Sequence, residues 1–149
     1  MTRAKPDVSE PQLAEFQVAL FEFVRDFGLL RQDETPCSMP VSVSDAHALT
    51  KLLDGSSSPS ELATYLGLTR STVTRLLVKL DERSWVRRRA DANDGRAYIL
   101  ELTANGRRQA ERVKEARRTR ISELLSRIPN GERDTVIRSM ALLSRACSE

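Results

Sequence analysis

The sequence predicts a mainly α-helical protein that carries one small β-hairpin. Apolar residues recur every three or four positions through most of the chain, as in amphipathic helices. Between residues 85 and 102 the pattern becomes strand-like on both sides of a turn that contains Asp94-Gly95. A length of 149 residues, with 40% hydrophobic and 30% charged residues, suits one folded domain. We therefore expect a single domain over residues 1–149.

The first predicted helix carries one long apolar stripe, which should extend to Leu30. Two prolines and several polar residues end it between Asp33 and Pro40. Ser44 is the expected N-cap of a second helix, and Asp54-Gly55 ends that helix. The stripe members are spaced alternately by three and four residues: Leu13, Phe16, Leu20, Phe23, Phe27 and Leu30.

Two further helices with sharp boundaries follow. Ser58, Pro59 and Glu61 form a capping-box pattern that starts a short helix over Pro59–Leu66. Gly67 can adopt the positive φ that ends it, and Thr69 is the expected cap of the next helix. The inward side chains of this next helix should be Val73, Leu76, Leu77 and Leu80.

The two helices have the spacing of a helix-turn-helix motif. Ala63 is small where two helices must cross, Gly67 lies four residues later at the turn, and Val73 lies six after that. This spacing resembles the helix-turn-helix pattern of bacterial regulators. The apolar positions between and beyond are filled by Leu62, Leu66, Leu68 and Leu76.

The hairpin and two more helices complete the predicted order. Strand-like runs flank the turn over residues 90–96, and Thr103 can cap a long charged helix that Pro129-Asn130-Gly131 breaks. The apolar face of this long helix should hold Ala110, Val113, Ile121, Leu124, Leu125 and Ile128. The last helix shows another stripe: Val136, Met140, Leu143 and Cys147.

Positive charge begins where the helix-turn-helix pattern reaches its second helix. Residues 1–68 hold 5 basic and 10 acidic side chains, whereas residues 69–96 hold 8 basic and 4 acidic ones. Arginine, lysine and hydroxyl groups suit phosphates and base edges, and a charged hairpin tip suits a minor groove. The residues predicted to contact DNA are Ser58, Arg70, Ser71, Thr72, Thr74, Arg75, Lys79, Arg87, Arg88, Arg89, Asp94 and Arg96.

Over nearly its whole length the chain resembles the MarR (multiple antibiotic resistance regulator) family of winged helix-turn-helix transcriptional regulators. Asp94-Gly95-Arg96 looks like the Asp-Arg-containing wing of these proteins. The resemblance implies that Arg96 enters the minor groove and that Asp94 orients a nearby arginine. It also implies that residues 41–103 bind double-stranded DNA, while residues 9–40 and 104–149 form the dimerisation helices of a homodimer on a pseudopalindromic operator.

The resemblance further implies a repressor that a small aromatic or phenolic effector releases from its operator. The effector would bind in a cleft lined by the first, second and fifth helices. One alternative is a redox-sensing regulator that uses Cys37, although Asp33 and Glu34 oppose formation of its thiolate. Another is a non-specific architectural DNA binder, which the acidic N-terminal half disfavours.

Other classes of protein lack support in the sequence. It shows no phosphate-binding glycine loop and no nucleophile motif, so we expect no enzyme activity and no cofactor. Cys37, Cys147 and the single histidine, His47, lack the spacing of a metal site. The sequence also contains neither a signal peptide nor an apolar run long enough to cross a bilayer, so we expect no membrane partner and a cytoplasmic location.

Overall fold

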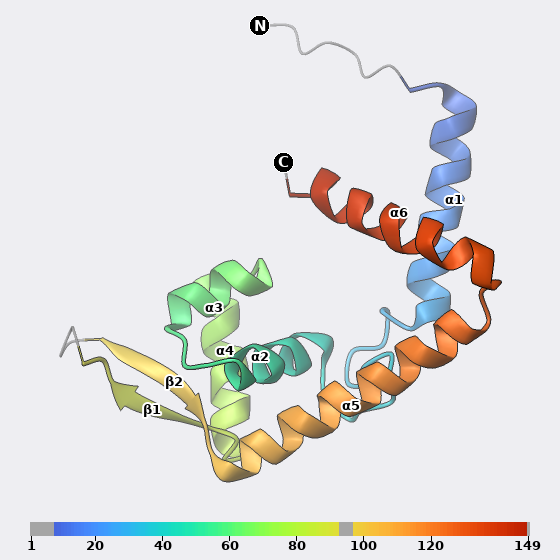
Figure 1. Ribbon diagram of the computed structural model, residues 1–149. Helices are drawn as coiled ribbons and strands as arrows, with labels where there is room; N and C mark the ends of the chain where they lie inside the picture. The colour runs from blue at the N-terminus through green and yellow to red at the C-terminus, as the bar shows by residue number, and fades with distance from the viewer. Residues whose placement is uncertain (1–7, 93–96, 149) are drawn as a thin grey trace, which may run out of the picture.

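Figure 1 shows a computed structural model of the chain, which describes residues 8–92 and 97–148. The described residues are mainly helical and include one antiparallel β-hairpin, so the predicted fold class is confirmed. The elements, in order, are α1 (Glu10–Phe27), α2 (Val43–Leu53), α3 (Pro59–Leu66), α4 (Arg70–Glu82), β1 (Val86–Ala90), β2 (Tyr98–Leu102), α5 (Ala104–Ser126), the 3-10 helix η1 (Asn130–Glu132) and α6 (Arg133–Ala146).

The main hydrophobic core lies among α2, α3, α4, the hairpin and the first turns of α5. Leu49, Leu62 and Leu100 come from three different elements and are fully buried in it. Gly106 lets α5 begin directly against the hairpin, because a Cβ at this position would collide with the carbonyl of Trp85. The core therefore fixes α4 and the hairpin against one support.

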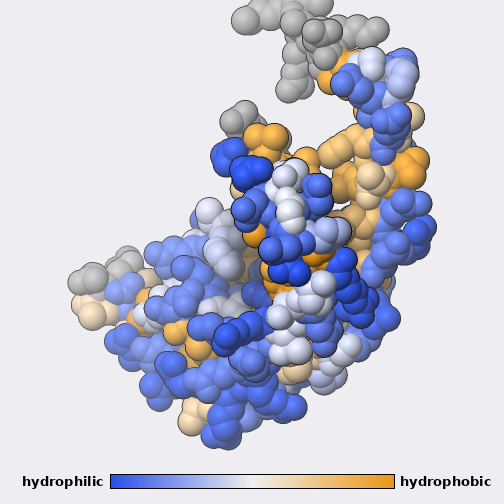
Figure 2. All heavy atoms as spheres, turned by 45° about the vertical axis from the view of Figure 1, so that its right-hand side comes forward, coloured by the Kyte–Doolittle hydropathy of each residue, from blue (hydrophilic) through white to orange (hydrophobic). Residues whose placement is uncertain are grey.

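Helix α5 links this core to the terminal helices. In Figure 1 it runs from the foot of the hairpin to the opposite end of the molecule, where α6 follows it and α1 stands nearby. Among the described residues, none in α1 or α6 is buried. Figure 2 shows hydrophobic side chains gathered along α1, below the grey N-terminal residues. No helix in the described ranges is both long and apolar enough to span a membrane.

Several helix ends differ from the prediction by one to three residues. Helix α1 ends at Phe27, before Leu30, because Gly28 takes a left-handed conformation (φ 92°) and its amide donates to the Arg25 carbonyl. Helix α5 ends at Ser126, before Ile128, and Cys147 follows the end of α6. The predicted end of α2 at Leu53 is confirmed.

The N-cap of α2 is Ser42, so the prediction of Ser44 is wrong. The hydroxyl of Ser42 accepts a hydrogen bond from the amide of Asp45 at 3.1 Å. Val41 precedes the cap and shares an apolar cluster with Ala46, four positions into the helix. This contact is a hydrophobic staple, and it favours the earlier serine as the start of the helix.

Candidate nucleic-acid interface and ligand cavity

The start of α3 and the turn between α3 and α4 are set by local geometry, as predicted. The Ser58 hydroxyl accepts from the Glu61 amide at 3.2 Å, and the Glu61 carboxylate accepts from the Ser58 amide at 2.7 Å. Hydrogen bonds from the Ser58 amide and hydroxyl to the carboxylate lower the pKa of Glu61. Gly67 then adopts a left-handed conformation (φ 64°), and the Thr69 hydroxyl caps α4 through the amide of Thr72. The Ser58 hydroxyl thus caps a helix, and its contact with DNA remains a prediction.

Helix α4 has one buried face and one solvent-facing face. Its buried side chains are the four that the sequence predicted, beginning with Val73. The remaining positions are exposed, except that Thr72 is partly buried. The predicted contact residues that α4 brings together on this free side are Arg70, Ser71, Thr74, Arg75 and Lys79.

The polar side chains of α4 divide into those with intramolecular partners and those without. The Thr74 hydroxyl donates to the carbonyl of Arg70, and the Thr72 hydroxyl lies 2.9 Å from that of Thr69. Within the described ranges, the side chains of Arg70, Arg75 and Lys79 form neither a hydrogen bond nor an ion pair. These three cations are therefore available for an external anion.

The arginines of the hairpin have partners that the sequence interpretation missed. Arg87 and Arg89 both donate to the carboxylate of Glu101, and Arg88 stacks over the ring of Tyr98, with 4.9 Å from its guanidinium carbon to the ring centroid. The signal for Glu101 was the hairpin register, which pairs Arg87 with Glu101 across the two strands. Asp94 and Arg96, at the predicted tip, lie outside the described residues.

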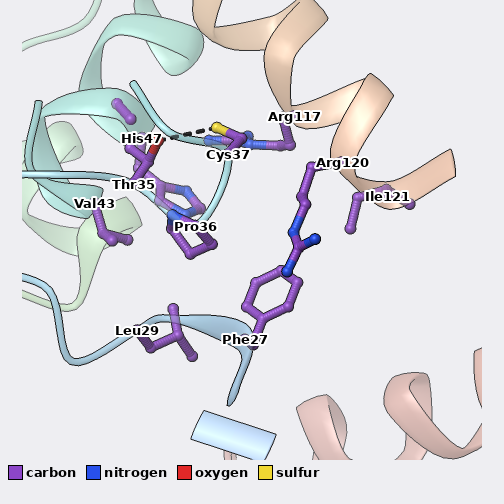
Figure 3. A pocket seen from close by; sticks show the side chains of 11 residues that line it. Phe27, Leu29, Thr35, Pro36, Cys37, Val43, His47, Arg117, Arg120 and Ile121 are labelled. Atoms are coloured by element: carbon purple, nitrogen blue, oxygen red, sulfur yellow. Dashed lines mark hydrogen bonds between the residues drawn. The ribbon is translucent and has the colours of Figure 1, made fainter. Parts of the chain in front are cut away.

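A cavity of about 200 Å³ lies where α1, α2 and α5 meet. Its wall is mostly apolar, but two arginines of α5 reach into it. Figure 3 shows Arg120 extending toward the ring of Phe27, and Arg117 extending toward Cys37 and His47. The lining side chains come from Phe27, Leu29, Thr35, Pro36, Cys37, Val43, Ala46, His47, Arg117, Arg120 and Ile121.

The electrostatics of the cavity favour a negative charge inside it. The Nε atom of Arg120 is buried and has no hydrogen-bond partner among the described residues. Leaving a buried donor unpaired is unfavourable, so an acceptor at this point would be stabilised. Desolvation and, second, the charge of Arg117 lower the pKa of His47 below its ordinary value of 6.5. The unpaired Nε of Arg120, together with the charge of Arg117 near His47, gives the cavity a positive character.

The two arginines were missed because the sequence interpretation listed only the apolar members of α5. Arg117 and Arg120 follow the buried Val113 by four and seven positions, so they continue its face of the helix. A charged residue on an otherwise apolar stripe was the available signal. The arginines also change the surroundings of Cys37, whose thiol lies 3.0 Å from the Thr35 hydroxyl and lines the same cavity as these two cations.

Comparisons with known proteins find one matching family model and several transcriptional regulators similar to this chain. A family model described as the HVO_A0261 N-terminal domain matches residues 39–124. An HTH-type transcriptional regulator of Mycobacterium tuberculosis is 35% identical over 113 residues, which cover 73% of this chain and 76% of that protein. The transcriptional repressor MprA of Escherichia coli is 34% identical over 88 residues, or 58% of this chain. The match covers 50% of the length of MprA.

Solved structures share the fold over nearly the whole chain. RV1404 of Mycobacterium tuberculosis has a TM-score of 0.70 and 20% identity, with coverage of 99% of this chain and 100% of that one. Streptococcus pneumoniae FabT, solved in complex with DNA, has a TM-score of 0.70 and 19% identity over 94% and 98% of the two chains. Lactococcus lactis ZitR, a zinc-responsive MarR family member, has a TM-score of 0.64 and 21% identity over 91% and 96% of the chains.

Proposed function

This chain belongs to the MarR family of helix-turn-helix transcriptional regulators, and we propose that it is a sequence-specific DNA-binding repressor. The observation that carries the proposal is the free face of α4, on which Arg70, Arg75 and Lys79 have no partner among the described residues. Unpaired guanidinium and ammonium groups on a helix of this size suit phosphates and guanine edges in a major groove. A basic helix taken alone usually faces only solvent, but α4 is the second helix of a helix-turn-helix motif.

The proposal includes a homodimer. Helices α1 and α6 expose large apolar side chains, among them Phe16 and Leu142, that the subunit itself leaves uncovered. In a dimer in which a second copy covers them, the two α4 helices could enter successive major grooves, which are about 34 Å apart. The operator should then be a pseudopalindrome, with the hairpins over the flanking minor grooves. Residues 9–40 and 104–149 are the proposed dimerisation segments.

We further propose that a small aromatic or phenolic anion binds the cavity and releases the operator. An apolar cavity of roughly 150 Å³ accommodates benzene, so about 200 Å³ has room for one ring and an acidic group. Phe27 and Ile121 would contact the ring, while Arg117 and Arg120 would hold the acidic group. The walls come from α2 on one side and α5 on the other. Because α2 shares its core with α4, a ligand that moves α2 relative to α5 would also move α4 relative to the dimer.

The proposal is tested by selecting bound DNA from a random library and measuring its affinity by fluorescence anisotropy. We expect a two-fold symmetric consensus, protected over two major grooves in footprints, and a much weaker affinity for scrambled DNA. Binding without a consensus would instead support the architectural alternative. A dimer that protects one isolated half-site would contradict the proposed geometry.

The effector is tested on the same operator complex with benzoate and related phenolic acids. Arg120→Gln should lose the response to these anions while it retains operator affinity. Arg118→Gln is the matched control, because Arg118 is exposed on the same helix and does not line the cavity. An equal response in wild type and Arg120→Gln would contradict the assignment of the cavity.

Oxidation sensing by Cys37 remains the alternative signal. Because Arg117 and Arg120 line the same cavity as the thiol, the fold brings two cations of α5 near it that are distant in sequence. The discriminating variant is Cys37→Ser. If it keeps operator binding but loses release by peroxide, the thiol is the sensor. If peroxide affects neither protein while a phenolic acid releases both, the ligand mechanism holds.

A further inference from the structure

The outer face of the hairpin holds one acidic side chain between two basic ones. The register places Arg87 directly opposite Glu101, and Arg89 lies two residues along the same strand, on the same face. Val86, Leu100 and Leu102 lie on the other face, toward the core. Glu101 is thus the acidic group nearest to both arginines on the outer face of β1 and β2.

Each oxygen of the Glu101 carboxylate binds a different arginine. Oε2 accepts from Nε and Nη2 of Arg87 at 3.2 and 3.1 Å, and Oε1 accepts from Nε of Arg89 at 2.7 Å. The Glu101 side chain is 22% exposed, whereas those of Arg87 and Arg89 are 66% and 52% exposed. The hydrogen bonds from Arg89 and Arg87 lower the pKa of Glu101, so it stays ionised at neutral pH. The carboxylate therefore holds both guanidinium groups while their outer edges face solvent.

A guanidinium group has five N–H donors, and this arrangement uses only some of them. Nη1 and Nη2 of Arg89, and Nη1 of Arg87, make no hydrogen bond to any other described residue. An arginine whose inner edge is held by a carboxylate presents its outer edge in a fixed direction, which suits a phosphate. Both long side chains are then already ordered before DNA binds, so binding loses less side-chain conformational entropy.

We propose that Glu101 is a positioning residue for DNA binding, which aims Arg87 and Arg89 at backbone phosphates beside the groove that the hairpin enters. The inference rests on the proposed DNA-binding function. Charge alone would disfavour an acidic group in a phosphate-binding face, and exposed ion pairs contribute little to fold stability. Orientation of two arginines by one carboxylate explains why an acidic residue occupies this position.

The test separates the position of the carboxylate from its charge. Glu101→Gln removes the charge, whereas Glu101→Asp keeps it but shortens the side chain, so that it cannot reach both arginines. We expect both variants to lose about fivefold in affinity for the operator and a similar factor for random DNA, because contacts to backbone phosphates do not depend on base sequence. Glu111→Gln is the matched control, since it removes the same charge from an exposed site on α5.

A double-mutant cycle with Arg89→Ala supplies the second measurement. In that background Glu101→Gln should lose part of its effect, because one of the two positioned groups is gone and Arg87 remains. The inference is overturned if Glu101→Asp binds as wild type while Glu101→Gln binds all DNA more tightly, which is the result for a simple charge effect. It is also overturned if neither variant differs from wild type. Failure of the wild-type protein to bind any selected DNA would refute the proposed function instead.

Discussion

The helix-turn-helix and hairpin region buries its apolar side chains within the subunit, whereas the terminal helices expose theirs. Leu49 and Leu62 have no exposed surface, but Phe16 is 49% and Phe21 61% exposed. Burial of apolar surface is the main favourable term in folding. The first region can therefore be stabilised by its own core, and the second needs another surface. One chain thus combines a region with its own closed core and terminal helices whose apolar side chains are exposed.

The exposed side chains of α1 occupy one continuous stripe, which distinguishes them from scattered surface apolar residues. Leu13, Phe16, Leu20 and Phe23 follow helical spacing and are each at least 39% exposed. Contiguous apolar patches on a soluble protein mark interaction sites. Since the chain belongs to a family of regulators, a second copy is the occupant that we propose. The two regions then make opposite predictions for substitutions of similar size.

The largest expected effect comes from placing charge on the α1 stripe. Phe16→Asp combined with Leu20→Asp should convert the dimer to a monomer and weaken operator binding by about 100-fold or more, because two linked half-sites become one. Sedimentation analysis and anisotropy measure the two effects. Glu22→Ala, on the opposite side of α1, is the control and should behave as wild type. A doubly substituted protein that remains dimeric would place the interface elsewhere.

A second prediction compares the two regions within the monomeric double variant. There Leu49→Ala should lower the free energy of unfolding by about 2–5 kcal/mol, because it leaves a cavity in a closed core. Leu13→Ala should change it by less than about 0.5 kcal/mol, because Leu13 is 51% exposed and lies outside the closed core. Urea denaturation measures both values. Equal losses would show that α1 is stabilised within its own subunit after all.

The third prediction concerns the division of labour inside the DNA-binding region. Arg75→Ala should cost about 1–3 kcal/mol at a cognate operator and change which sequences are selected, if its guanidinium reads a base. Thr72→Ala should act in the same direction. Arg96→Ala should weaken binding with a smaller change in major-groove preference. Affinity and salt dependence are measured for each, with Arg145→Ala on α6 as a charge-matched control. An Arg96→Ala protein with unaltered affinity and salt slope would exclude the hairpin tip from binding.

The sequence predicts best those features that depend on neighbouring residues. The capping box at Ser58, the left-handed Gly67 and the cap at Thr69 are local geometry, and all three are confirmed. The start of α2 was mispredicted because two serines stood within reach of it. The contact between Val41 and Ala46, which decides between them, depends on how the chain packs.

The candidate sites depend on contacts across the chain, and the sequence predicts these less well. The α4 face could be predicted, because a single helix carries all of it. Arg117 and Arg120 meet Cys37 only after α5 packs against the segment before α2, some 80 residues earlier in the chain. Glu101 could have been found only by extending the hairpin register back from the turn. Long-range pairing was therefore the missing information at both sites.

The smallest expected effect is at His47, where the cavity joins the two regions. The pKa of His47 is lowered in the folded protein, so as pH falls through about 6.5 the unfolded state takes up a proton before the folded state does. Stability should therefore decline slightly as pH falls through that range, and His47→Gln should remove this decline. Because His47 is the only histidine in the sequence, the assignment is direct.

An anion in the cavity should reverse part of this shift. A carboxylate near Arg117 would offset the charge that lowers the pKa of His47, so binding should be accompanied by proton uptake and should strengthen as pH falls. Benzoate is a suitable probe, since its own carboxyl group does not titrate in this range. Calorimetry in buffers of different ionisation enthalpy measures the uptake. Equal proton uptake by wild type and His47→Gln would show that the anion binds away from this histidine, and hence outside the junction between the two regions.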